Sequence, residues 1–155
     1  MDCLPASAAG LLGRARILQS KGDSEGALES VHQGLAAQPG SAVASELQIL
    51  EMQLLWERNQ PDQALMQAQK WLQQPSSSRS DEVRRFAASL SLHATGCSAA
   101  LPYLQAIQNP MTIDLVQQAD CTENKLMKRQ LLEKALQINN DPSVQDAILS
   151  RLGLH

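Results

Sequence analysis

The side chains that could carry out chemistry in this chain are few, and their spacing matches no familiar active site. His93 and Cys97 lie four residues apart and could share one helix face, as in a Cys-His nucleophilic dyad. Gly96 falls between them in a stretch that favours a turn, however, which would break the helical spacing. His32 and His155 have no carboxylate or cysteine at the spacing of a metal site or a catalytic triad. We therefore expect no enzyme activity, no metal site and no cofactor.

The cysteines are the other reactive side chains. Cys3, Cys97 and Cys121 are an odd number and include no CxxC pair, so their spacing supports neither a metal-ligand set nor a disulfide framework. We expect free, partly buried thiols in a reducing compartment, which makes a cytoplasmic location the first expectation. The alternative is a bridge between Cys97 and Cys121, which would indicate an oxidising compartment and a periplasmic or secreted protein.

Composition limits the fold and the partners. The 155 residues are 43% hydrophobic but only 3% aromatic, and Ala, Leu and Gln are abundant whereas strand formers are scarce. The net charge of −3 argues against a nucleic-acid partner, which usually requires a basic face. No apolar run approaches the length of about 20 residues that a membrane span needs, and MDCLPASAAGLL at the N-terminus lacks the features of a signal peptide. We expect a soluble protein built from closely packed helices.

Residues 22–40, GDSEGALESVHQGLAAQPG, indicate how the helices are arranged. A Gly-Asp turn precedes a short amphipathic stretch, and a Pro-Gly stop follows it. Gly22 can make a tight turn between two helices, and Pro39 prevents the second helix from continuing. Taking Ala27 as a marker, the small and aliphatic residues that would line the contact between the two helices are Ala15, Leu18, Val31 and Leu35.

The same spacing recurs twice further along the chain. Ala64 follows Ala27 by 37 residues, and Ala99 follows Ala64 by 35 residues. We expect Ala27 and Ala99 to be buried where paired helices touch. The third repeat departs from the pattern, because Pro102 falls inside its second helix, which either starts near Ala100 or is kinked.

Local signals also mark several helix ends. Pro61 is well suited to the first position of a helix, Asp141 is a good N-cap for the last helix, and Gly153 can end it. Between them, KRQLLEKALQINNDP reads as the second helix of a looser pair. Its apolar side would consist of Leu132, Ala135, Leu136 and Ile138.

These repeated features resemble the tetratricopeptide repeat (TPR), a helical hairpin of 34 residues with small residues, a turn glycine and a closing proline at similar offsets. The resemblance implies an all-α, right-handed α-solenoid of about three to four antiparallel helix pairs with a C-terminal capping helix. We expect a single TPR-like domain over residues 1–155. Its repeats would lie at about 8–41, 45–75 and 80–110, followed by a degenerate pair at 111–140 and a capping helix at 142–153.

The resemblance also implies a binding surface, because the first helices of successive TPR pairs line a concave groove. Trp56 would be an anchor for a partner's side chain, with packing between neighbouring pairs as the alternative role, while Arg16 and Arg84 would hold carboxylates or carbonyls. The Lys/Asn carboxylate clamp of some co-chaperones in the family is absent. Carried over from the family's groove-facing positions, the candidate partner-binding residues are Leu12, Arg16, Gln19, Ile49, Gln53, Trp56 and Arg84.

We therefore expect a non-catalytic adaptor, scaffold or assembly chaperone that binds a peptide or an amphipathic helix of a partner protein. The alternative is a regulatory helical domain of a larger enzyme or of a secretion or envelope component. RNA recognition by a helical repeat is disfavoured by the acidic charge balance. The sequence predicts neither the partner's identity nor an oligomeric state.

Overall fold

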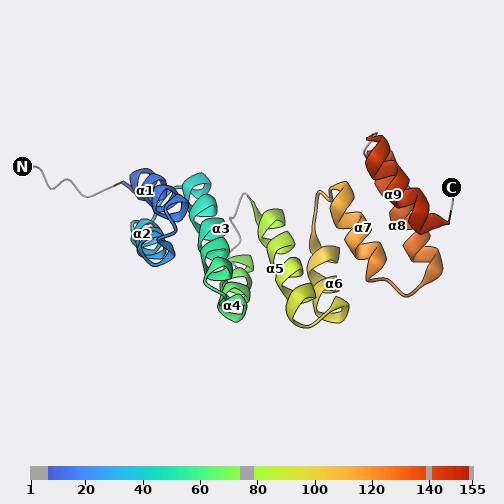
Figure 1. Ribbon diagram of the computed structural model, residues 1–155, viewed down its shortest axis with the longest axis horizontal. Helices are drawn as coiled ribbons and strands as arrows, with labels where there is room; N and C mark the ends of the chain where they lie inside the picture. Colours follow the sequence, from blue (N-terminus) through green and yellow to red (C-terminus); the bar gives the residue numbers. More distant parts are fainter. Residues whose placement is uncertain (1–6, 74–78, 139–140, 154–155) are drawn as a thin grey trace, which may run out of the picture. The chain divides into compact units, whose positions relative to one another are not determined.

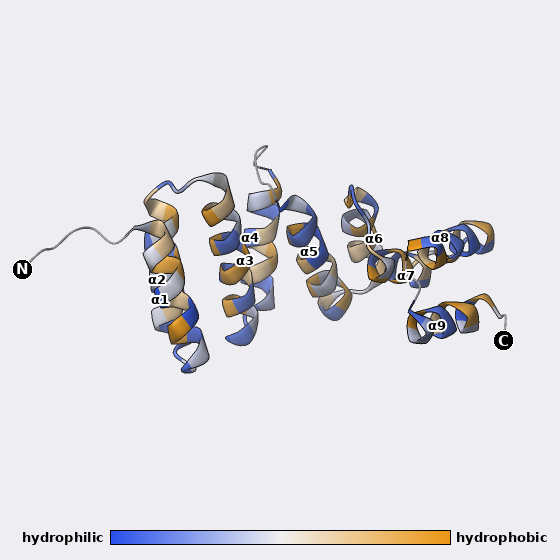
Figure 2. Ribbon diagram, turned by 90° about the horizontal axis from the view of Figure 1, so that it is seen from above, coloured by the Kyte–Doolittle hydropathy of each residue, from blue (hydrophilic) through white to orange (hydrophobic). Residues whose placement is uncertain are grey.

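The computed structural model describes residues 7–73, 79–138 and 141–153, and within these ranges every regular element is a helix (Figure 1). The predicted all-α class is confirmed. Hydrophobic and hydrophilic residues are interspersed along the helices, as expected where one side of each helix is buried (Figure 2). None of the described helices is long and apolar enough to cross a membrane. The helices are α1 (Ala8–Ser20), α2 (Ser24–Ala36), α3 (Ser41–Glu57), α4 (Pro61–Leu72), α5 (Ser80–Ala94), α6 (Cys97–Ala106), α7 (Thr112–Asp120), α8 (Lys125–Ile138) and α9 (Pro142–Leu152).

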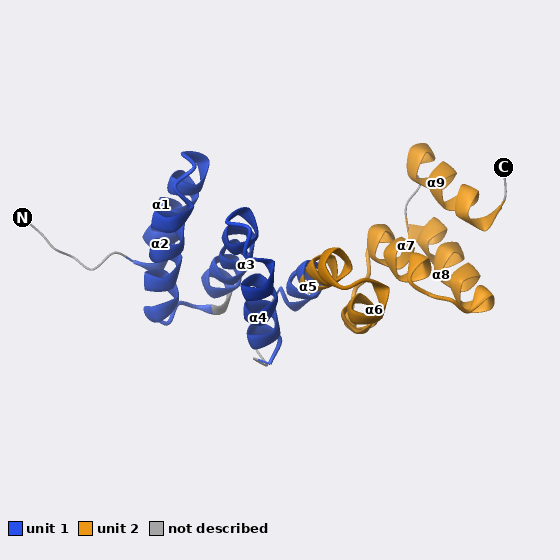
Figure 3. Ribbon diagram, turned by 60° about the horizontal axis from the view of Figure 1, so that its bottom comes forward, with its two compact units in different colours: residues 1–86 blue, residues 87–155 orange. Residues whose placement is uncertain are grey.

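The chain divides into two compact units, Met1–Phe86 and Ala87–His155, with the boundary inside α5 (Figure 3). Unit 1 contains α1 to α4 and the first part of α5, and unit 2 contains the remainder. The expectation of one domain with the repeat boundaries given above stays a prediction.

The first helix pair, α1 and α2, forms as the sequence predicts. Gly22 has a φ of 82°, a left-handed conformation that glycine adopts without strain, and it separates the two helices. The Asp23 carboxylate accepts a hydrogen bond of 2.9 Å from the Gly26 amide and so caps α2. Ala15 and Ala27 are fully buried, so the predicted contact through small residues is confirmed for this pair.

The pair α3 and α4 forms its turn and its buried helix contact with different residue types. Asn59 takes a left-handed conformation (φ 59°) where the first pair has glycine, and asparagine tolerates this region better than most residues. Pro61 is the first residue of α4, as expected. Ala64 and Ala68 are fully buried, and so is Met52, which fills the place of a small residue on α3.

The α6 helix differs from the expectation in register. It begins at Cys97 rather than near Ala100, so Pro102 lies inside the helix and removes one backbone hydrogen bond. Ala100 and Leu104, four residues apart, face the core of unit 2, where they pack with Ala88. Ala99 is only partly buried, and the expectation that it marks the contact is therefore wrong by one residue.

The C-terminal helices α7, α8 and α9 share a separate apolar cluster. The Asp141 carboxylate caps α9 by accepting hydrogen bonds of 2.8 Å from the Ser143 hydroxyl and 3.0 Å from the Ser143 amide. The hydroxyl bond first, and the amide bond second, lower the pKa of Asp141. Gly153 ends α9 with a φ of 74°, as predicted. Ile138 departs from the expectation, because it is the last residue of α8 and is 49% exposed. The buried members of the cluster are Leu115, Val116, Ala119, Leu132, Ala135 and Ile148.

A disulfide joins Cys97, the first residue of α6, to Cys121, the C-cap of α7. Their Cα atoms are 5.1 Å apart, within the usual range for such a bond. The expectation of free thiols is therefore wrong for these two residues, while Cys3 lies outside the described residues. Because the Cys97 sulfur is bonded, the considered dyad with His93 has no thiol.

Candidate protein-interaction surfaces

Two helices of unit 1, α1 and α3, are in contact, and polar side chains of one form hydrogen bonds with those of the other. The Arg16 guanidinium donates a hydrogen bond of 2.6 Å to the Glu46 carboxylate, and Gln19 donates one of 2.9 Å to Glu57. Arg16 and Gln19 are two of the predicted partner-binding residues. Each is held by a carboxylate of α3, the helix that carries the predicted residues Ile49, Gln53 and Trp56.

The accessible side of α3 continues this surface. Glu46, Gln53 and Glu57 follow one another at seven and four residues, so they form a single stripe along the helix. Trp56 lies beside this stripe with 40% of its surface exposed, and Ile49 is partly buried. We call the surface formed by Arg16, Gln19, Glu46, Gln53 and Trp56 the α1–α3 face.

Two predicted site residues are placed differently. Leu12 is 6% exposed and belongs to the apolar core, so the expectation that it contacts a partner needs correction. Arg84 lies on α5 and forms an ion pair of 2.8 Å with Asp81, one turn earlier on the same helix. Its guanidinium already has a carboxylate partner, and a ligand would have to compete with Asp81 for it.

A buried carboxylate links three helices of unit 1 behind this surface. Glu51 is 3% exposed, and one of its oxygens accepts a hydrogen bond of 3.2 Å from the Trp71 indole. The other oxygen lies 2.9 Å from His32 Nε2. Since a buried carboxylate is costly without partners, these two contacts stabilise the association of α2, α3 and α4. Sequence reasoning found none of this arrangement, although Trp71 and Glu51 stand out as large polar-tipped residues in apolar stretches.

Arg79 and Glu82 form another charged pair in unit 1. The hydrogen bond to Glu82 raises the pKa of Arg79, burial acts in the opposite direction, and the charges of Glu82 and Glu46 raise it further. Glu46 therefore lies within electrostatic reach of two arginines, Arg16 and Arg79.

A hollow of about 580 Å³ lies beside His32, between α2, the end of α3 and the start of α4. Charged residues of both signs line it, among them Glu25, Glu29 and Arg58. In the part of the chain that the structure describes, no group of three or more His, Cys, Asp or Glu side chains could hold a metal ion.

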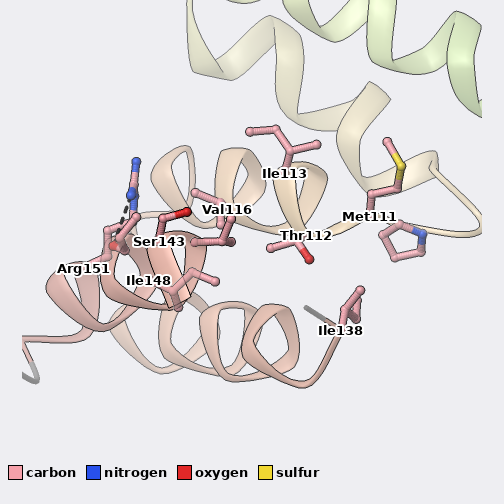
Figure 4. A pocket seen from close by; sticks show the side chains of 11 residues that line it. Met111, Thr112, Ile113, Val116, Ile138, Ser143, Ile148 and Arg151 are labelled. Carbon is pink, nitrogen blue, oxygen red and sulfur yellow. Dashed lines mark hydrogen bonds between the residues drawn. The ribbon is translucent and has the colours of Figure 1, made fainter. Parts of the chain in front are cut away.

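Unit 2 has an apolar groove of about 710 Å³ between α7, the end of α8 and α9 (Figure 4). Val116 and Ile148 are buried parts of its lining. Met111, Ile113 and Ile138 also line it, and all three are about half exposed. Sequence reasoning missed this site, and the only signal was that Met111 and Ile113 are apolar residues without a place in the core pattern. We call it the α7–α9 groove, defined by Met111, Ile113, Val116, Ile138, Ile148 and Arg151.

Comparison with known proteins supports the fold. The sequence matches no protein-family model and no curated protein. The structure is similar to the crystal structure of YrrB, a TPR protein with an unusual peptide-binding site, with a TM-score of 0.65 and 19% sequence identity. The similarity covers 96% of this chain and 76% of YrrB. The helical hairpins and this match together show that the chain has a TPR-like helical-repeat fold.

Proposed function

We propose that this protein is a non-catalytic adaptor, scaffold or assembly chaperone that binds a peptide or helix of a partner protein on the α1–α3 face. The observation that carries the proposal is the exposed stripe of α3 beside Trp56, joined to α1 by the Arg16–Glu46 ion pair. The TPR-like fold supports it, since such folds typically bind other proteins through their first helices.

Each residue of the face has a role in this proposal. Trp56 packs against an apolar side chain of the partner, because a half-exposed indole gains contact area when it is covered. Gln19 and Gln53 donate and accept hydrogen bonds along the partner's backbone. Ile49, which is partly buried two turns before Trp56 on α3, is a further proposed apolar contact beside the face.

The arginines supply charge recognition. The Arg16–Glu46 pair is largely exposed, so it contributes little to folding and can be exchanged for a pair with a partner's carboxylate. Arg84 is the second proposed contact for a carboxylate, reached when the partner displaces Asp81. Such contacts steer association and favour a partner segment with acidic residues.

The disulfide bears on the compartment in which the protein would work. Because disulfides persist mainly in oxidising compartments, the Cys97–Cys121 bridge favours a periplasmic or extracellular location over the cytoplasm. It therefore favours a component of a secretion or envelope system as the second candidate function.

Affinity capture with quantitative mass spectrometry tests the proposal. Three baits are compared: the wild-type chain, a Trp56→Ala variant and a Met66→Ala variant. Met66→Ala is the matched control, since Met66 is 65% exposed on α4 and lies outside the face. A true partner is retained by the wild type and by Met66→Ala but strongly depleted with Trp56→Ala. Equal retention by all three baits would place binding away from the α1–α3 face.

A further inference from the structure

We propose that the α7–α9 groove is a second docking site, which takes the apolar side of a short amphipathic helix with basic residues at its margin. The groove lies entirely in unit 2, whereas the α1–α3 face lies in unit 1. This inference therefore does not depend on the proposed function, and each site can be disabled without the other.

The exposure of apolar side chains is the first argument. Eight large hydrophobic residues of the described ranges are exposed, and Met111, Ile113 and Ile138 among them line this one groove. Buried Val116 and Ile148 complete its apolar lining (Figure 4). A gathering of exposed apolar side chains over an apolar floor is unfavourable in water, and such patches commonly mark a binding site.

The charges within the groove argue for an apolar occupant. Among the described residues, Arg151 is the one charged member of the lining, and its guanidinium donates hydrogen bonds of 2.9 and 3.3 Å to the two oxygens of Asp120 on α7. This bidentate pair joins α7 to α9 and balances the charge of the arginine. A carboxylate from a ligand would have to displace Asp120, whereas an apolar side chain requires no such exchange.

The charges at the margin argue for basic flanking residues. Asp146 is exposed on α9 three residues after Ser143, which lines the groove, and residues at this spacing are neighbours on a helix surface. Asp141 is exposed at the N-terminus of the same helix, and its lowered pKa keeps it ionised. Two acidic residues beside a neutral apolar groove complement lysine or arginine at the edge of a partner's apolar stripe.

The size of the groove fits two to three turns of helix. Its lining on α9 runs from Ser143 to Arg151, which corresponds to about 12 Å along a helix axis at a rise of about 1.5 Å per residue. Its volume of about 710 Å³ is in the range of ligand sites. A partner helix would thus place apolar side chains at positions i, i+4 and i+7 in the groove.

A labelled model peptide can stand in for the natural partner in a direct test. The probe is a fluorescein-labelled helical peptide of about 14 residues with leucines on one side, lysines at the margin of that side and glutamine and alanine elsewhere. Its control has the same composition with the leucines distributed around the helix. Fluorescence anisotropy should show that the wild-type chain binds the probe at least about tenfold more tightly than the control.

The variants are chosen so that folding is kept. Met111→Ser places a preferred capping residue at the N-cap of α7, and Ile113→Gln changes a 53% exposed side chain. Each should weaken binding of the probe by roughly tenfold, and circular dichroism should show unchanged helix content. Leu126→Gln is the matched control, since Leu126 is 66% exposed in the same unit but outside the groove. Asp146→Lys should weaken binding and reduce its dependence on salt.

Three results would overturn the inference. Equal affinity for the probe and its control peptide, or no binding of either, would show that the groove does not recognise an amphipathic helix. An equal loss with Leu126→Gln and Ile113→Gln would place binding elsewhere on unit 2. A dimer in sedimentation experiments that Ile113→Gln dissociates would mean that a second copy of the chain occupies the groove.

Discussion

Replacing both bridged cysteines with serine should destabilise unit 2 by an amount that follows from the position of the disulfide. Cys97 and Cys121 are 24 residues apart in sequence. In the chain-entropy treatment, opening a loop of this length returns conformational freedom to the unfolded chain, worth about 3.5 kcal/mol at 25 °C. Cys97 is exposed and Cys121 partly exposed, so the serines remove little buried apolar surface. The loss of the bridge should therefore dominate the effect.

Urea unfolding of the full chain, followed by circular dichroism, measures this change. With an m-value of about 1.5 kcal/mol/M, a loss of about 3.5 kcal/mol lowers the midpoint of the affected transition by about 2.3 M. All variants carry Cys3→Ser to prevent exchange with a third thiol. Wild-type protein treated with reductant should unfold at the same midpoint as the variant with Cys97→Ser and Cys121→Ser, because both lack the bridge.

Thiol titration provides an independent check. The denatured wild-type protein should release two more thiols after reduction than before it, since one disulfide contains two sulfurs. If reduction releases no further thiols, or if the unfolding midpoint does not move, the bridge does not form in solution. The argument for an oxidising compartment would then be refuted as well.

Three other changes test the packing and the electrostatics. Ala27→Leu should destabilise unit 1 by about 1–3 kcal/mol in urea unfolding because the site is fully buried and has no room for the larger side chain; an unchanged midpoint would contradict the α1–α2 packing. Trp71→Phe should lower the free energy of unfolding by about 1–3 kcal/mol in the same assay, because the buried Glu51 carboxylate loses a hydrogen-bond donor. Wild-type stability in this variant would show that the bond does not contribute to stability. The lowered pKa of Asp141 means that this residue stabilises the fold above its unfolded pKa of about 4 and that this contribution is lost as pH falls through the folded value. Asparagine keeps a capping side chain but has no charge, so the stability difference between the wild type and Asp141→Asn should shrink below about pH 4 in thermal unfolding. A difference that is the same at about pH 3 and pH 7 would count against a contribution from the ionised carboxylate.

Features set by neighbouring residues could be predicted from the sequence. Gly22 at a tight turn, Pro61 at a helix start and Asp141 at an N-cap depend on the conformations that these residues favour within one or two turns of chain. The buried contact at Ala27 was also predictable, because the turn at Gly22 fixes how α1 and α2 face each other.

Features that depend on where a helix begins were less predictable. Ala99 and Ala100 are adjacent and chemically identical, and only the start of α6 at Cys97 decides which of them faces the core. A family pattern places Leu12 on the binding side, whereas the packing around α1 buries it. A shift of one residue turns a side chain by about 100° around a helix, which is enough to change its role.

Features formed between distant parts of the chain were not predictable from one sequence. The Cys97–Cys121 bridge could be named only as the alternative to free thiols, because the spacing of the two cysteines does not indicate that α6 and the end of α7 meet. The α7–α9 groove depends on how two helices separated by α8 are placed around it. The Glu51 contacts with Trp71 and His32 likewise require three helices to be in position first.

The central claim is that the α1–α3 face binds a partner protein through Trp56. The most direct test is isothermal titration calorimetry of the captured partner against the wild type, Trp56→Ala and Met66→Ala. We predict that Trp56→Ala weakens binding by about 2 kcal/mol, or roughly 30-fold in Kd, while Met66→Ala leaves it unchanged and both variants keep their helix content. A folded Trp56→Ala variant that binds the partner with wild-type affinity would contradict the claim.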